Sequence, residues 1–211
     1  MTPKSSTKKR QFPSAALVFC FLLHLCPFLA QLEKMDTLNY LKAVKKGQLH
    51  FADGSFKEIP YWGDPTWMHL FCVRHAEKEK GDPHDPALST EGDARAEHLG
   101  RIMASAGLNM VYASPARRAQ LTAEPVQRRS QTQPVETYKP EEQVEWILEM
   151  LAHYPGKKIL IVGHQDSVPH LLNYLNGGGF DFDNISNADY GKFYVVATKG
   201  IGETTVIEAR Y

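Results

Sequence analysis

The stretch Met68-His69-Leu70-Phe71-Cys72-Val73-Arg74-His75 decides the fold prediction for this chain. Its first six residues are almost all apolar, which is typical of a strand buried on both faces of a parallel sheet. The run then ends in a cation followed by an imidazole. Because open α/β sheets bind ligands beyond the carboxyl ends of their strands, Arg74 and His75 are candidates for a functional site.

Two further strand-like runs end in the same kinds of residue. Residues 110–113 lead into Ser114-Pro115-Ala116-Arg117-Arg118, and residues 158–162 lead into Gly163-His164. If the three runs are neighbouring parallel strands, their ends bring Arg and His side chains to one edge of the sheet. The sequence therefore predicts a single electropositive pocket built from three separate segments.

From residue 68 onward, strand patterns alternate with helix patterns. This alternation predicts an α/β fold with a mostly parallel sheet and helices on both faces. Strands are expected at 68–74, 110–113, 134–138, 158–163, 193–198 and 204–209, and helices at 90–106, 115–129, 141–154 and 167–176. Ser89 or Thr90 is expected to cap the first helix, and Ser114 to cap the second, with Pro115 as its first residue.

A length of 211 residues suggests one domain with short additions. We expect a leader at 1–30, an N-terminal extension with a short hairpin at 31–67, and the main domain at 68–211. Within the extension, Asp53-Gly54 lies between two short apolar runs, which indicates a hairpin turn. Residues 36–44 show a short helical periodicity.

The N-terminus has the pattern of an export signal. Lys8-Lys9-Arg10 precedes the apolar stretch 15–30. This order matches the charged and apolar regions of a signal peptide, and the apolar stretch is short for a membrane-spanning helix, which needs about 20 residues. We predict a secreted or periplasmic protein. An uncleaved membrane anchor in the same segment is the alternative, and we expect no other membrane contact.

The charge balance excludes some classes of partner. The chain has 24 basic and 24 acidic residues, but residues 1–30 contain basic residues and no acidic one, so the remainder is mildly acidic. A general nucleic-acid-binding face is therefore not expected. His164, Asp166 and His170 lack the accessory ligands of a recognised metal motif, so we expect no metal and no other cofactor.

The order strand-Arg-His, strand-Ser-Pro-x-x-Arg, strand-Gly-His resembles the histidine phosphatase superfamily. Leu88-Ser89 with Gly92 is similar to that family's Leu-Ser/Thr-x-x-Gly stretch, and residues 118–123 are similar to its Arg-Ala-x-x-Thr-Ala helix. The resemblance covers residues 68–211. It implies a three-layer, phosphoglycerate-mutase-like fold, a histidine phosphatase domain over those residues, and an exported, short-chain branch of the family.

The resemblance assigns roles that the residue chemistry supports. Arg74 and Arg118 can bind phosphate oxygens through their forked donors. His75 can attack phosphorus through one ring nitrogen, provided that the other donates a hydrogen bond to a backbone carbonyl. His164, protonated beside the phosphate, would stabilise the transferring group and complete the phosphate-binding set.

The proton donor for the leaving oxygen is less well specified. Glu77 lies two residues after the nucleophile, and Asp166 lies two residues after His164. Both are candidates for the general acid, and Glu136 or Glu141 could also approach the site.

We therefore predict a metal-independent phosphatase that hydrolyses phosphate monoesters through a phosphohistidine on His75. The substrate is expected to be small and phosphorylated, with sugar phosphates as candidates by analogy with exported relatives. Two alternatives remain. One is a catalytically silent phosphate-binding or adaptor protein of the same fold, and the other is a phosphotransferase or mutase.

Overall fold

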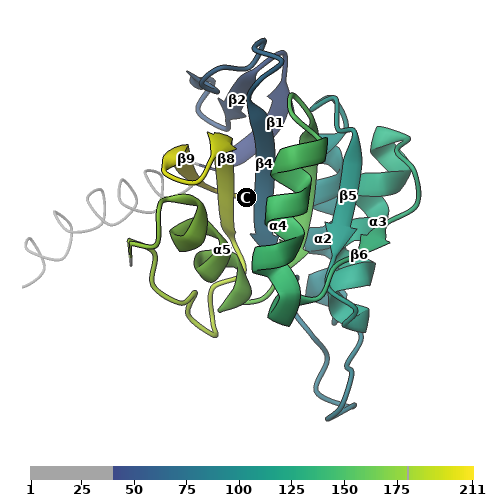
Figure 1. Cartoon of the computed structure of the whole chain (residues 1–211). Coiled ribbons are helices and arrows are strands. Elements are labelled where there is room, and N and C mark those ends of the chain that lie inside the picture. Colours follow the sequence, from purple (N-terminus) through teal and green to yellow (C-terminus); the bar gives the residue numbers. More distant parts are fainter. Residues whose placement is uncertain (1–39, 180) are drawn as a thin grey trace, which may run out of the picture. The chain divides into compact units, whose positions relative to one another are not determined.

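The computed structural model describes residues 40–179 and 181–211 (Figure 1). The predicted signal or anchor at 1–30 lies outside the described residues, as does the first part of the predicted extension. Across the described part of the chain, the helices are all too short or too polar to cross a bilayer.

A six-stranded sheet forms the centre of the described domain, in the order β6-β5-β7-β4-β8-β9. Its strands are β4 (Met68–Arg74), β5 (Met110–Ala113), β6 (Glu136–Thr137), β7 (Lys158–Gly163), β8 (Lys192–Gly200) and β9 (Glu203–Arg210). Strands β6, β5, β7 and β4 run parallel, whereas β8 and β9 are antiparallel to their neighbours. The predicted, mostly parallel α/β sheet is confirmed.

Helices cover both faces of this sheet. They are α2 (Thr90–Met103), α3 (Arg117–Ser130), α4 (Gln143–His153) and α5 (Ser167–Leu175), with a single 3-10 turn, η1 (Pro140–Glu142), leading into α4. In Figure 1, α4 crosses the near face of the sheet and α2 lies behind it. Each predicted helix is present, and their observed bounds differ from the predicted ones by at most a few residues.

Two apolar cores result from the alternation of side chains along the strands. In β4, Phe71 and Val73 face the core under α2 and α3, whereas Leu70 and Cys72 face the core under α4 and α5. Both sets are fully buried. A strand that must be apolar on both faces explains the almost entirely apolar run from which the fold was predicted.

The described part of the N-terminal extension is a small antiparallel sheet. It consists of β1 (Leu41–Lys45), β2 (Gln48–Phe51) and β3 (Phe56–Glu58). The helical periodicity noted for 36–44 was therefore misleading over the described residues. Lys46 and Gly47 both have positive φ, at 50° and 78°, and this pair of values defines the tight hairpin turn that joins β1 to β2.

The predicted start of the second helix is also wrong. Helix α3 begins at Arg117, with Ala116 at its N-cap and no side-chain cap. The hydroxyl of Ser114 is fully buried and bonds His164 instead. The Ser114 side chain therefore contributes to the site at the end of β5 and does not cap α3.

The first turn of α2 packs directly on the chain that follows β4. The Ser89 hydroxyl accepts a hydrogen bond from the Gly92 amide at 3.2 Å, and the Ser89 amide donates to the Glu77 carbonyl at 2.9 Å. A Cβ atom on Gly92 would come within 2.1 Å of that carbonyl oxygen. The glycine is therefore required for the close approach of α2 to the segment beside the predicted nucleophile.

We expect Gly92→Ala to lower the free energy of unfolding by at least about 2 kcal/mol, because a backbone clash outweighs the helix propensity gained. Gly63 is the control, since a Cβ there meets no atom within 4 Å and its φ is not positive. Urea unfolding of both variants measures the difference. Equal stability of the two would show that the packing at Gly92 is less tight than described.

Candidate active site

The site lies at the carboxyl ends of three adjacent strands. In the order β5-β7-β4, the residue that follows each strand is Ser114, His164 and His75 respectively. The His75 amide donates to the Gly163 carbonyl at 2.9 Å, and the Ser114 amide donates to the Val162 carbonyl at 3.1 Å. These bonds extend the hydrogen bonding between the parallel strands beyond the strand ends, so the three segments stay in register.

An open cavity of about 990 Å³ lies at these strand ends, and Arg74, His75, Arg118 and His164 all line it.

Both ring nitrogens of His75 have partners that determine their protonation. Nδ1 lies 2.8 Å from the carbonyl oxygen of Ala76, which can only accept, so Nδ1 carries the proton. Nε2 receives a hydrogen bond from Nε of Arg118 at 3.1 Å. Because a guanidinium can only donate, Nε2 keeps its lone pair. The predicted hydrogen bond to a backbone carbonyl is present, and the nitrogen it leaves free is Nε2.

Burial keeps the His75 ring neutral. The residue is 4% exposed, and burial lowers its pKa to about 3, although the Ala76 carbonyl acts in the opposite direction. The charges of Arg118, His164 and Arg74 lower the pKa further. A ring that is neutral at physiological pH is the form that can act as a nucleophile.

Arg118 joins the two histidines. Its Nε donates to His75, and its Nη2 makes a long contact of 3.5 Å with Nδ1 of His164. One turn further along α3, the Thr122 hydroxyl donates to the Arg118 carbonyl and accepts from the Ala76 amide. Arg117, by contrast, is exposed. The structure thus brings Arg118, and not Arg117, to the His75 ring.

Arg74 is held by the loop that precedes β8. Its Nη1 donates to the carbonyls of Ser186, Asn187 and Asp189 at 2.9–3.1 Å. Its guanidinium also lies over the Tyr190 ring, 4.0 Å from the centroid. Nε is buried and has no hydrogen-bond partner among the described residues. A buried donor without an acceptor is unfavourable, so this guanidinium is suited to binding an anion.

Hydrogen bonds to its ring and to its backbone amide hold His164 in place. Its Nε2 lies 2.7 Å from the Ser114 hydroxyl, and its backbone amide donates to the Ser167 hydroxyl at 2.9 Å. Burial lowers the pKa of His164, and the charge of Arg118 adds to that effect. The protonated state assigned to this residue from the sequence is therefore disfavoured until an anion enters the cavity.

The two candidate acids lie in different surroundings. Glu77 forms a bidentate ion pair with Arg95, with Nε 2.9 Å from each carboxylate oxygen, and it does not line the cavity. Asp166 lines the cavity and caps α5 by accepting from the Ser167 amide at 2.8 Å. Glu141, from η1, also lines the cavity. Proton donation is therefore better placed for Asp166 or Glu141 than for Glu77.

Several lining residues were not found from the sequence. Gln143 comes from α4, His170 from α5, and Gln165 from the short segment between β7 and α5; Asn184, Asn187 and Tyr190 come from the loop before β8. Apart from Gln165, which lies two residues after β7, these positions do not follow a strand of the parallel set, so a search at the strand ends does not find them. Ser114 could have been found, because it follows directly after a predicted strand. Within the described residues, no group of three or more His, Cys, Asp or Glu side chains is arranged to hold a metal ion.

One family model matches part of this chain. Residues 70–142 match the family model of the histidine phosphatase superfamily, branch 1. A search of curated proteins finds no significant match. The resemblance to this superfamily indicated by the sequence motifs is confirmed, and it supports a phosphatase-type enzyme at the level of the superfamily.

Solved structures share the fold. The protein histidine phosphatase SixA complexed with tungstate is 17% identical, with a TM-score of 0.57, and the match covers 68% of this chain and 97% of that one. A mycobacterial glucosyl-3-phosphoglycerate phosphatase is 12% identical, with a TM-score of 0.54 and coverage of 69% and 98%. Mycobacterial hydrolase 1 is 13% identical, with a TM-score of 0.55 and coverage of 69% and 100%. At these identities the likeness concerns the fold alone.

We expect the His75 ring to remain neutral well below the usual histidine pKa of 6.5. In a pH titration followed by ¹⁵N NMR, Nδ1 should show the shift of a protonated nitrogen and Nε2 that of an unprotonated one down to about pH 4. A His75→Gln variant assigns the signals. Protonation of Nε2 near pH 6.5 would contradict the burial and the hydrogen bonds described for this ring.

Proposed function

We propose that this protein, which has the histidine phosphatase fold, is a metal-independent phosphatase that hydrolyses phosphate monoesters through a phosphohistidine on His75. The observation that carries the proposal is the arrangement around Nε2 of that ring. The nitrogen has a lone pair, and donors from Arg118 lie directly beside it. Arg74 and His164 line the same cavity.

The first half-reaction follows from these positions. A phosphate group entering the cavity takes the Arg118 donors that otherwise cap Nε2, because its oxygens are charged acceptors. The freed lone pair of His75 attacks phosphorus, the bond from phosphorus to the ester oxygen breaks, and the alcohol leaves. Arg74 and Arg118 neutralise the charge on the equatorial oxygens, and the negative charge raises the pKa of His164, which then adds a third cationic donor.

The second half-reaction returns the site to its starting state. Water attacks phosphorus and gives a proton to the carboxylate that protonated the alcohol in the first step, the bond to Nε2 breaks, and inorganic phosphate leaves. Asp166, Glu141 and His170 are exposed side chains of the cavity lining, so water reaches the intermediate. Access of water favours hydrolysis over transfer to a second substrate, since a mutase must exclude water from its intermediate.

We assign proton donation to the leaving oxygen to Asp166. Asp166 lies two residues from His164 and lines the cavity, whereas Glu77 does not line it and forms an ion pair with Arg95. An acid is needed most for poor leaving groups such as alkoxides, and little for activated ones such as phosphohistidine or acyl phosphates.

The amide-bearing residues of the cavity lining favour a small, hydroxylated leaving group. Side-chain amides of Gln143, Gln165, Asn184 and Asn187 line it. An amide can both donate to and accept from a hydroxyl group. Sugar phosphates are therefore the substrate class that we propose. The predicted secreted, periplasmic or membrane-anchored location, which depends on residues 1–30, stays part of this proposal.

We expect the full chain to release phosphate from a panel of esters in the presence of a chelator, and His75→Ala to lose at least about a thousandfold in kcat. Acid quench of the wild-type reaction should trap phosphate on His75. Phosphate binding without release from any ester would favour the silent, adaptor-type alternative. Dependence on an added phosphate acceptor other than water would favour a phosphotransferase or mutase.

We expect Asp166→Asn to lower kcat for alkyl phosphates by about 10²- to 10⁴-fold and to leave an acyl phosphate almost unaffected. The amide can still accept the capping bond of α5, so the fold should be retained. Glu141→Gln is the matched control, since Glu141 is the other acidic residue from the candidate set that lines the cavity. A leaving-group dependence that appears in Glu141→Gln instead would reassign the acid.

A further inference from the structure

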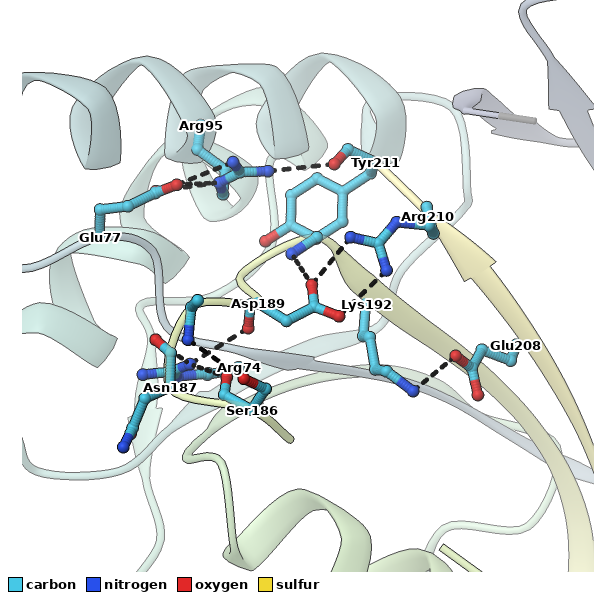
Figure 2. A network of polar contacts seen from close by, with 12 residues as sticks. Arg74, Glu77, Arg95, Ser186, Asn187, Asp189, Lys192, Glu208, Arg210 and Tyr211 are labelled. Atoms are coloured by element: carbon cyan, nitrogen blue, oxygen red, sulfur yellow. Dashed lines mark hydrogen bonds and ion pairs between the residues drawn. The ribbon is translucent and has the colours of Figure 1, made fainter. Parts of the chain in front are cut away.

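The loop of residues 186–190 wraps the guanidinium of Arg74 (Figure 2). Three of its backbone carbonyls accept from Nη1, and the Tyr190 ring lies 4.0 Å from the guanidinium carbon. Arg74 is 4% exposed. The orientation of this cation in the cavity is therefore set by the backbone of the loop, because no carboxylate forms an ion pair with Arg74 in the described part of the chain.

An ion pair between Asp189 and Arg210 links this loop to β9, the last strand of the sheet. Both carboxylate oxygens of Asp189 accept from Arg210, at 2.9 and 3.0 Å, as Figure 2 shows. The same carboxylate accepts from the Gly191 amide at 3.0 Å, and the Asp189 amide donates to the Ser186 carbonyl at 2.9 Å. One residue thus holds the turn closed through its side chain and contacts Arg74 through its carbonyl.

We propose that the Asp189–Arg210 ion pair is a positioning element for the phosphate-binding site. Its function is to hold the carbonyls of residues 186–189 where they orient Arg74, so that the donors not used by the loop face the phosphate. The inference depends on the proposed function for its role in turnover, but its effect on anion binding can be measured separately. Neither residue of the pair lines the cavity, so both act through Arg74.

A neighbouring ion pair on the same strands gives a matched control. Lys192 and Glu208 form a contact of 2.7 Å between β8 and β9, next to Arg210, and make no contact with the loop carbonyls. Arg210 and Glu208 are each 44% exposed. Removal of Arg210 or of Glu208, the more exposed member of each pair, should have a similarly small effect on stability, but only removal of Arg210 should disturb Arg74.

We would measure the affinity of the full chain for inorganic phosphate by calorimetry, with kcat and KM for one ester alongside. Arg210→Ala and Asp189→Ala are each expected to weaken phosphate binding by about tenfold, as expected when a charge-assisted hydrogen bond is misplaced. The double variant should bind phosphate no worse than Asp189→Ala does, since that single variant already removes the contact with Arg210. Arg210→Lys keeps the positive charge but loses the paired guanidinium donors, so its phosphate affinity should lie between those of the wild type and Arg210→Ala.

The Glu208→Ala variant should bind phosphate as the wild type does, with a similar melting temperature to Arg210→Ala. Wild-type affinity in Arg210→Ala, or equal losses in Arg210→Ala and Glu208→Ala, would overturn the positioning role. If the wild type binds phosphate but hydrolyses no ester, the proposed function fails while the weaker binding of the variants still supports the positioning role. No phosphate binding by the wild type would overturn both.

Discussion

The hydrogen bond from Nδ1 of His75 to the carbonyl of Ala76 is the contact on which the rest of the site depends. It fixes the proton on one nitrogen and leaves the lone pair of Nε2 facing Arg118. Without it, a buried imidazole could present either nitrogen to the cavity, and Nε of Arg118 would have no acceptor fixed on the ring. The proposed nucleophile and the first phosphate donor are thus set by one backbone carbonyl.

The site brings positive charge together in a chain whose formal net charge is zero. Arg74 and Arg118 lie beside two histidines whose pKa values are lowered chiefly by burial. The arginines remain charged because a guanidinium is protonated in almost any environment. Neutral carbonyls, rather than carboxylates, accept the hydrogen bonds of Nη1 of Arg74. Carbonyl dipoles orient the cation without neutralising it, so its field remains available for a bound anion.

Much of the fold could be read from periodicity alone. Residues 68–74 must be apolar on both faces because helices cover both sides of the sheet, and this requirement is visible in the sequence. The hairpin of β1 and β2 was missed because Lys46 and Gly47 determine it, and a lysine with positive φ carries no sequence signal. Ser114 was assigned to a helix cap because Ser-Pro is a common helix start, but a buried histidine nearby forms a hydrogen bond with its hydroxyl.

The sequence by itself predicted the four residues that the structure brings together around one cavity. Arg74 ends a strand and His75, Arg118 and His164 follow strands at short spacing, and the carboxyl ends of neighbouring parallel strands must meet at one edge. Only the tertiary structure decided which carboxylate faces the cavity and what orients Arg74. Glu77 is close to His75 in sequence but is bound by Arg95 from α2, and the loop that holds Arg74 is more than a hundred residues away along the chain. Such contacts depend on how distant elements pack, for which a local pattern of residues gives no information.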